Sequence, residues 1–128
     1  MILADTSIVV ELLRTRSPRL QSLVVSNSAA ICGPTRTEIL HATRDAKHRQ
    51  QLITALGLFQ QISIPDSLWE EAGDNLAALR AAGTTISLAD VLIATVAISN
   101  NLDLWTRDQD FTLVQKVLPS LRLFQEPP

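Results

Sequence analysis

The chain has 128 residues, of which 46% are hydrophobic and 19% are charged, and its formal net charge is −2. These values exclude a disordered chain and a strongly basic protein, so any binding of nucleic acid would need a local basic patch. The length is typical of one domain, and we expect a single domain over residues 1–128.

Short apolar runs alternate with helical patterns in the first half of the chain. Residues 6–16 carry apolar side chains at helical spacing, and Gly33 closes an apolar run just before Pro34, which suits the first turn of a helix. From these patterns we predict a strand over 1–5, helices over 6–16 and 18–27, a strand over 29–32, and helices over 34–42 and 47–58.

The second half continues the alternation. One helix has an N-cap candidate in Asp66 and a stop signal in Gly83. No charge lies between Val91 and Ile98, which is typical of a helix buried on nearly every face. We predict a strand over 61–65, helices over 66–83 and 87–100, a strand over 102–106, a helix over 110–118 and a last strand over 121–124.

Strands that alternate with helices imply a parallel sheet that is covered on both faces. We therefore predict an α/β protein, a three-layer α/β/α sandwich with a central, mainly parallel sheet of about five strands. The two tryptophans, Trp69 and Trp105, and the single cysteine, Cys32, are expected in the core rather than in a binding surface.

The sequence gives no sign of export or of membrane insertion. The first residues include Asp5 and Glu11 and lack a basic start, so they form a poor signal peptide. No continuously apolar run approaches the roughly 18 residues needed to cross a bilayer. We therefore expect a cytoplasmic protein without a membrane partner.

Acidic residues follow the predicted strands at the positions where open parallel sheets place their binding sites, the carboxyl ends of the strands. Asp5 ends the first strand, and Glu38 lies in the first turns of the helix after the second. Asp90 opens the buried helix, and Asp108 and Asp110 directly follow the fourth strand. The predicted topology therefore brings these acids to one edge of the sheet.

Each acid also has a purely structural interpretation. Asp5 is a candidate N-cap, while Thr35 with Glu38 and Ser87 with Asp90 have the spacing of a capping box. The two aspartates after the fourth strand are common turn residues. Both interpretations are compatible, because caps at helix starts also direct side chains toward that edge.

Convergence of the acids would create a site for a divalent cation. Two carboxylates about 4 Å apart repel by about 4 kcal/mol at an effective dielectric constant of 20, and a bound cation removes this conflict. Oxygen ligands alone favour Mg²⁺ or Mn²⁺ over zinc, and neither His41 nor His48 has the partners of a zinc site. Such a metal site suits hydrolysis of phosphodiesters by a metal-activated water.

Four motifs stand in order along the chain: ADTS at 4–7, TE at 37–38, SLADVLIATVA at 87–97 and TRDQDF at 106–111. Together they resemble the PIN-domain family, particularly its VapC-type toxin nucleases from toxin–antitoxin operons. The resemblance covers almost the whole chain and implies a Mg²⁺- or Mn²⁺-dependent endoribonuclease. It also implies a homodimer and an antitoxin that inserts a segment into the active-site groove.

The resemblance also implies roles for individual residues. Asp5, Glu38 and Asp90 match the first three acidic positions of the family, and Asp108, ahead of Asp110, matches the fourth. All five are expected to be catalytic. All except Glu38 are expected to bind metal.

Two hydroxyl side chains are expected to support these acids. Ser7 matches a hydroxyl often found beside the first acid in the family, although it could equally cap a helix. Thr106 could orient a carboxylate or simply end a strand.

Basic residues close to the acids are candidates for contacts with the RNA backbone. Each of them could instead belong to a solvated helix face or pair with a neighbouring acid. The candidates are Arg36, Arg44, Lys47, Arg49 and Arg107.

Two other classes of function remain open at this point. A phosphoryl-transfer domain of receiver or haloacid-dehalogenase type also places aspartates at strand ends, but LADTS lacks the second aspartate of a D-x-D nucleophile motif. A non-catalytic interaction domain would use the acids only as helix caps, and it predicts no stabilisation by metal. Thermal melting with and without Mn²⁺ separates these alternatives.

Overall fold

The computed structural model of the protein describes residues 1–128 and contains one parallel sheet. The order of its strands is β3-β2-β1-β4, so β1 lies in the interior of the sheet, and its Leu3 is paired with Ala30 on one side and with Leu104 on the other. The strands are β1 (Ile2–Ala4), β2 (Ala30–Cys32), β3 (Gln60–Ile62) and β4 (Asp103–Trp105).

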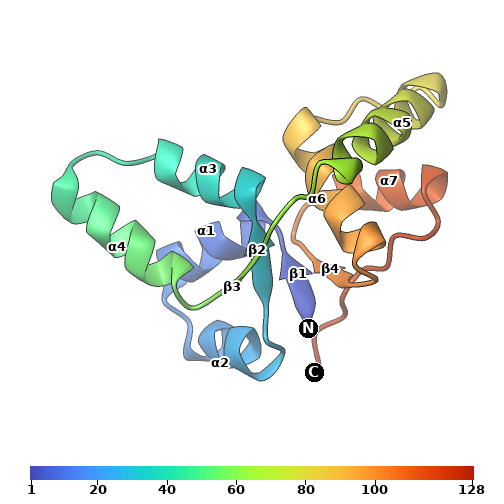
Figure 1. The fold of residues 1–128 in the computed structure, drawn as a ribbon. Coiled ribbons are helices and arrows are strands. Elements are labelled where there is room, and N and C mark those ends of the chain that lie inside the picture. Colours follow the sequence, from blue (N-terminus) through green and yellow to red (C-terminus); the bar gives the residue numbers. More distant parts are fainter.

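Seven helices cover the two faces of this sheet, which confirms the predicted three layers. Helices α1 to α4 lie on one side and α5 to α7 on the other (Figure 1). They are α1 (Thr6–Thr15), α2 (Pro18–Ser26), α3 (Gly33–His41), α4 (Ala46–Leu56), α5 (Ser67–Ala81), α6 (Leu88–Ser99) and α7 (Asp110–Val117). None of them combines the length and the apolar character that crossing a membrane requires.

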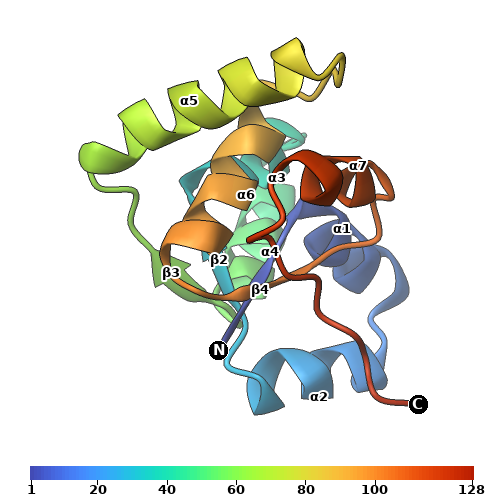
Figure 2. The same ribbon diagram turned by 90° about the vertical axis from the view of Figure 1, so that its right-hand side faces the viewer.

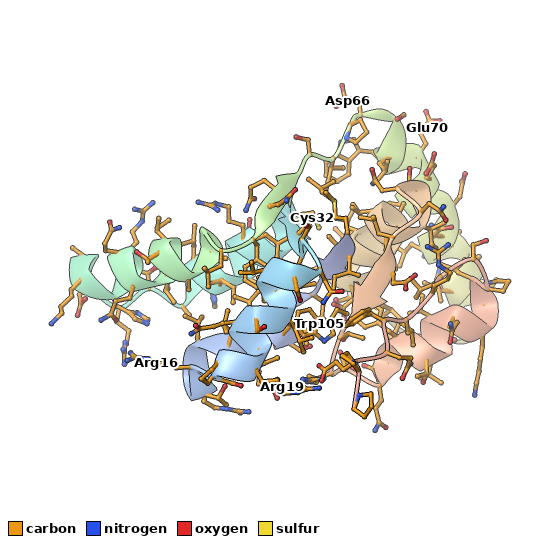
Figure 3. All side chains as sticks on the ribbon, turned by 90° about the horizontal axis from the view of Figure 1, so that it is seen from below. Arg16, Arg19, Cys32, Asp66, Glu70 and Trp105 are labelled. Atoms are coloured by element: carbon orange, nitrogen blue, oxygen red, sulfur yellow. The ribbon has the colours of Figure 1, made fainter.

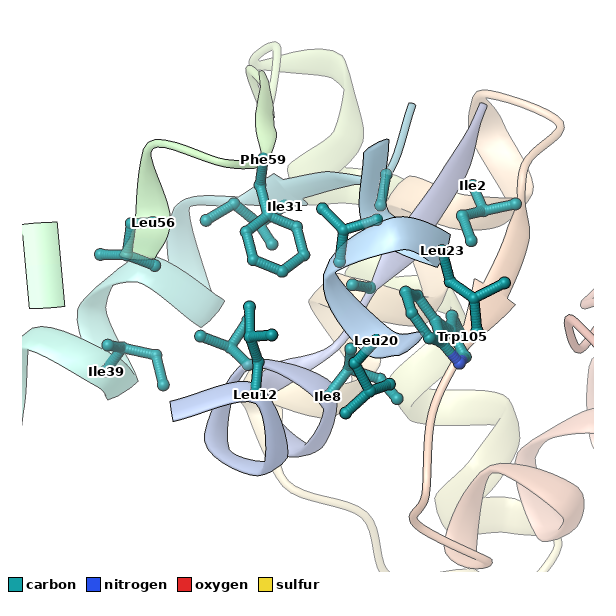
Figure 4. Close-up of a cluster of buried hydrophobic side chains, with 14 of the residues drawn as sticks. Ile2, Ile8, Leu12, Leu20, Leu23, Ile31, Ile39, Leu56, Phe59 and Trp105 are labelled. Atoms are coloured by element: carbon teal, nitrogen blue, oxygen red, sulfur yellow. The ribbon is translucent and has the colours of Figure 1, made fainter. Parts of the chain in front are cut away.

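Each face of the sheet has its own apolar core. Successive side chains of a strand point to opposite faces, so Ile2 packs with α1 and α2 while its neighbour Leu3 packs with α6. The first core is built mainly from aliphatic side chains around Phe59 and Trp105 (Figure 4).

The second core is centred on α6. Its residues Val91–Ala97 are all buried, as expected for a helix that carries no charge along this stretch. Helix α5 crosses one end of α6 (Figure 2), and the amide of Asn75 donates a hydrogen bond to Thr95 across the two helices, at 3.0 Å. This packing holds α6, whose first turn carries Asp90, against α5.

The predicted last strand is wrong. Residues 121–124 form only one bridge, between Leu104 and Leu123, with hydrogen bonds from Leu104 N–H to the Arg122 carbonyl and from Phe124 N–H to the Leu104 carbonyl, both 2.8 Å. The chain then leaves β4 and runs toward α2 (Figure 2), so the pairing does not extend into a strand. The sheet therefore has four strands rather than about five.

Two predicted caps form no side-chain hydrogen bond. Asp66 occupies the N-cap position of α5, as predicted, but its backbone angles are helical and its side chain caps nothing. Helix α3 begins at Gly33, which places Thr35 inside its first turns, fully buried, and excludes a capping box with Glu38.

One of the two tryptophans differs from the prediction. Trp105 is buried, with 1% of its surface exposed, as predicted, whereas Trp69 is 52% exposed. Trp69 lies in the first turn of α5, between Asp66 and Glu70, which Figure 3 shows at the outline of the molecule. Cys32 is buried and free, as predicted.

Candidate active site

Asp5 lies at the carboxyl end of β1, in the interior of the sheet. Its N–H donates to the Trp105 carbonyl of β4 at 3.0 Å, and its carboxylate caps α1 by accepting from the Ile8 N–H at 3.4 Å. Only 3% of the residue is exposed. The predicted N-cap role is therefore confirmed, and the same geometry fixes the carboxylate at the edge of the sheet.

Two hydroxyl groups hold the Asp5 carboxylate. Ser7 Oγ donates to Oδ1 and Thr106 Oγ1 donates to Oδ2, each at 2.5 Å. The same hydroxyls accept backbone hydrogen bonds from the next loop: Arg107 N–H donates to Ser7 and Asp108 N–H donates to Thr106, both at 2.9 Å. The loop after β4 is thereby tied to the end of β1.

Burial raises the pKa of Asp5, and the hydrogen bonds from Ser7 and Thr106 oppose this shift. A carboxylate with so little solvent around it stays ionised only if donors or a cation stabilise the charge. The two hydroxyls supply part of that stabilisation.

Asp90 lies in the first turn of α6 beside its N-cap. Ser87 Oγ accepts a hydrogen bond from the Asp90 N–H at 3.2 Å, which is one half of the predicted capping box. The pKa of Asp90 is raised to about 6, first by burial and then by the charges of Asp108, Asp5 and Glu38, while the hydrogen bond with Ser87 lowers it. The four acids therefore interact electrostatically at one edge of the sheet.

The other acids differ in how they are held. Glu38 is exposed on α3 and accepts a hydrogen bond of 2.6 Å from the hydroxyl of Thr6. Asp108 is half-buried and its Oδ1 accepts from the Asp110 N–H at 2.9 Å, which is the predicted turn geometry. Asp110 is exposed at the start of α7, and among the two it is Asp108 whose charge raises the pKa of Asp90.

None of these five acids takes part in an ion pair. The ion pairs of the structure instead involve Glu11, Glu126 and Asp103. No three acidic, histidine or cysteine side chains stand close enough together to ligate one ion. The acids therefore form a cluster of unneutralised charge and not a closed ligand cage.

The basic residues predicted to contact RNA lie in three settings. Arg36 is half-buried on α3, while Arg44, Lys47 and Arg49 are exposed at or just before the start of α4. Arg107 is engaged elsewhere: its Nε and Nη2 donate to Glu11, at 3.2 and 3.0 Å, and its Nη1 pairs with Glu126 at 2.6 Å.

Cavities open on both sides of Glu38. A cavity of about 680 Å³ between α1, α3 and α4 has mainly apolar walls, with Thr6 and Glu38 among its lining residues together with Arg14, Arg16 and Arg44. A second cavity, of about 670 Å³, is lined by Glu38, by Ala89 next to Asp90, and by the exposed Trp69.

Two features of the site were not predicted. The hydroxyl of Thr6 donates a hydrogen bond to Glu38, which lies 32 residues away in the sequence. The only local sign of this contact was that a hydroxyl residue directly follows Asp5. Glu11 and Glu126 hold Arg107, and no local pattern indicates this, because Glu11 and Arg107 are 96 residues apart.

Comparison with known proteins gives relatives that share this fold. Ribonuclease VapC6 of Mycobacterium tuberculosis is 29% identical over 96 residues, which is 72% of this chain and 75% of that protein. VapBC2 from Rickettsia felis, solved bound to a DNA fragment from its promoter, has a TM-score of 0.82 at 22% identity, covering 99% of this chain and 100% of that one.

DNA-bound VapBC from Salmonella typhimurium has a TM-score of 0.80 at 16% identity, covering 97% of this chain and 98% of that one. A family model described as the PIN domain matches residues 2–117, a range that contains all the acids of the site. The chain therefore belongs to the PIN domain family.

Proposed function

We propose that the protein is a metal-dependent endoribonuclease, the toxin of a type II toxin–antitoxin pair, which hydrolyses RNA phosphodiester bonds with a metal-activated water. The observation that carries this proposal is the cluster of Asp5, Glu38, Asp90 and Asp108, whose charges raise the pKa of Asp90 and have no basic partner. The named ribonuclease among the relatives of the chain supports the reaction.

The residues of the cluster fit a hard divalent ion. They offer only carboxylate oxygens, which suit Mg²⁺ or Mn²⁺. A dication would offset both the burial and the neighbouring like charges that raise the pKa of Asp90. Without an ion, no three of these carboxylates stand close enough to share one. Asp5, Asp90 and Asp108 would therefore have to draw together around the ion to hold it, with Asp110 as a further ligand. When bound, the ion lowers the pKa of a water nucleophile and stabilises the leaving oxygen.

The remaining roles belong to side chains of the protein itself. Ser7 and Thr106 keep the Asp5 carboxylate in one orientation, because each oxygen accepts from one of the hydroxyls. Glu38 is exposed and accepts a hydrogen bond from Thr6. It would act as the general base that accepts a proton from the attacking water.

Positive side chains on α3 and around the start of α4 would hold the RNA backbone. Arg36, Arg44, Lys47 and Arg49 have no carboxylate partner, so their charges are available to phosphates. Arg107 differs from them, because its guanidinium already binds two carboxylates.

We further propose that residues 1–128 act as one nuclease domain, as a homodimer, and that an antitoxin inhibits it. Several structural relatives were solved as toxin–antitoxin complexes, among them one from Klebsiella pneumoniae. The apolar cavity between α1, α3 and α4 suits an apolar segment of such a partner, and a segment seated there would cover Glu38.

The experiment is cleavage of a mixed pool of structured RNAs by the purified protein, with EDTA and after addition of Mg²⁺ or Mn²⁺. We expect cleavage only with the metal. Equal cleavage in EDTA would contradict a metal-dependent mechanism, and trapping of a phosphoaspartate mimic with fluoride would favour phosphoryl transfer instead.

A further inference from the structure

We propose that Glu126 is a positioning residue for the active site: it holds Arg107, and through it the loop 106–108, so that Thr106 and Asp108 meet Asp5. Nothing in the sequence motifs assigns a role to Glu126. The inference rests on the proposed function, since it concerns the site at which that function would occur.

Glu126 is fixed by three donors. Its Oε1 accepts from Trp105 Nε1 at 2.8 Å and pairs with Arg107 Nη1 at 2.6 Å, and its Oε2 pairs with Arg19 Nη1 at 2.8 Å. Figure 3 shows Trp105 and Arg19 beside the C-terminal segment. Trp105 is itself buried and packs edge-on against Phe124, with ring centroids 5.7 Å apart, so the anchor is rigid.

The carboxylate of Glu126 keeps its charge under ordinary conditions. Partial burial raises its pKa, but hydrogen bonds from Arg19, Trp105 and Arg107 outweigh this and lower the pKa to about 2. The ion pair between Glu126 and Arg107 therefore does not depend on pH in the neutral range.

Arg107 joins three parts of the molecule. Its guanidinium contacts Glu126 of the C-terminal segment and Glu11 of α1, and its backbone N–H donates to Ser7, a hydrogen-bond donor to the Asp5 carboxylate. Thr106 and Asp108 lie on either side of Arg107. The hydroxyl of Thr106 donates to the Asp5 carboxylate, and the backbone N–H of Asp108 donates to the Thr106 hydroxyl. A displacement of Arg107 therefore moves both groups relative to Asp5.

The loop has little packing of its own on the side of the C-terminal segment. A cavity of about 370 Å³ lies there, lined by residues 106–109 and by Leu123–Glu126. The ion pair between Glu126 and Arg107 joins the two walls of this cavity. With no filled core between them, the position of the loop depends on polar contacts such as this one.

Partners that orient metal ligands without touching the metal typically change metal affinity or activity by about 10–100-fold when removed. For Glu126→Ala we expect the Mn²⁺ concentration that gives half-maximal thermal stabilisation to rise about tenfold. We also expect kcat for RNA cleavage to fall by a similar factor while KM changes little. Glu126→Gln keeps the shape and an acceptor for Trp105, so it should recover part of both effects.

A matched control exists in the same segment. Arg122 pairs with Asp103 at 2.7 Å, at the opposite end of β4 from the loop. Arg122→Ala removes a comparable surface ion pair and should lower the melting temperature without moving the Mn²⁺ midpoint or kcat.

The outcomes are distinct. If Glu126→Ala has the wild-type Mn²⁺ midpoint and kcat and only melts earlier, as Arg122→Ala does, Glu126 is a structural tie and the proposal is overturned. Should Glu126→Ala fail to fold, Glu126→Gln and Arg107→Lys decide by the same two readouts. If the wild-type protein shows neither stabilisation by Mn²⁺ nor cleavage, the proposed function itself fails.

Discussion

Two groups of acidic side chains meet at the loop after β4 and differ in their surroundings. The paired acids, Glu11 and Glu126, both bind Arg107. The unpaired acids have no basic partner; they are Asp5, Glu38, Asp90 and Asp108. One acid of each group shows the contrast in its pKa: that of Glu126 is lowered to about 2, whereas that of Asp90 is raised to about 6.

Under the proposed function, this difference separates acids that stabilise the fold from acids that act at the site. A paired acid stabilises the fold, whereas a half-buried acid among like charges destabilises it, and a marginally stable protein keeps such a cluster only where a ligand needs it. Arginines are available nearby, since Arg107 lies next to Asp108 in the sequence yet points to Glu11 and Glu126. Under the proposed function, the cluster is left free for an external cation.

The largest expected effect is the loss of cleavage when an unpaired acid is neutralised. Asp90→Asn keeps the volume of the side chain and removes the charge, so we expect RNA cleavage to fall by at least about 1000-fold, because metal-ion stabilisation contributes several kcal/mol to the barrier. The control is Asp103→Asn, which neutralises an acid of the opposite end of β4. If Asp90→Asn cleaves RNA as fast as Asp103→Asn does, Asp90 acts only as part of a helix cap.

The unpaired acids should also make metal binding depend on pH. Metal binds the ionised carboxylate, so protons compete with it below the pKa of Asp90, about 6. We expect the apparent affinity for Mn²⁺ to fall by roughly tenfold for each pH unit below this value. Calorimetric titration between pH 5 and about pH 8 measures it; a flat profile would place the binding site away from Asp90.

Much of the fold and of the candidate site was predictable from local patterns in the sequence. The helices and the four strands follow from the apolar patterns, and the acids could be placed at one edge because parallel strands align their carboxyl ends. The pairing of Arg107 was not predictable, because its partner Glu11 lies 96 residues away. Which acids remain unpaired is thus decided by tertiary structure.

The errors have the same origin. Residues 121–124 have the composition of a strand, but the route of the chain toward α2 limits them to one bridge with Leu104. Trp69 has the character of a core residue, yet its place in the first turn of α5 leaves it 52% exposed. Composition alone does not report where an element lies relative to the sheet.

A smaller effect is expected from the exposed positive charges around the start of α4. Replacing Arg44, Lys47 and Arg49 with alanine should weaken RNA binding and reduce the slope of log K against log salt by about 0.7 for each phosphate that the variant no longer neutralises. The exposed Lys116 on α7 gives the control, Lys116→Ala. An unchanged slope in the triple variant would exclude this part of α4 from the RNA path.

The smallest effect concerns stability without metal. Because the folded-state pKa of Asp90 is raised from 3.8 to about 6, its ionisation costs folding free energy; the cost is absent below pH 3.8 and complete above about pH 6. Asp90→Asn should therefore be about 1–2 kcal/mol more stable than wild type at neutral pH, after allowance for its partial exposure. Glu126→Gln should be less stable instead, because Glu126 has a lowered pKa. Urea melts at neutral pH and near pH 4 test both signs.

Thermal unfolding with and without Mn²⁺ tests most directly whether the unpaired acids form a metal site. At 100 times its dissociation constant, an ion that binds only the folded state adds about 2.7 kcal/mol, which raises the melting temperature of a chain this size by about 10 °C. We predict this rise for the wild type and for Asp103→Asn, and no rise for Asp90→Asn. No rise in the wild type, or an equal rise in Asp90→Asn, would contradict the account.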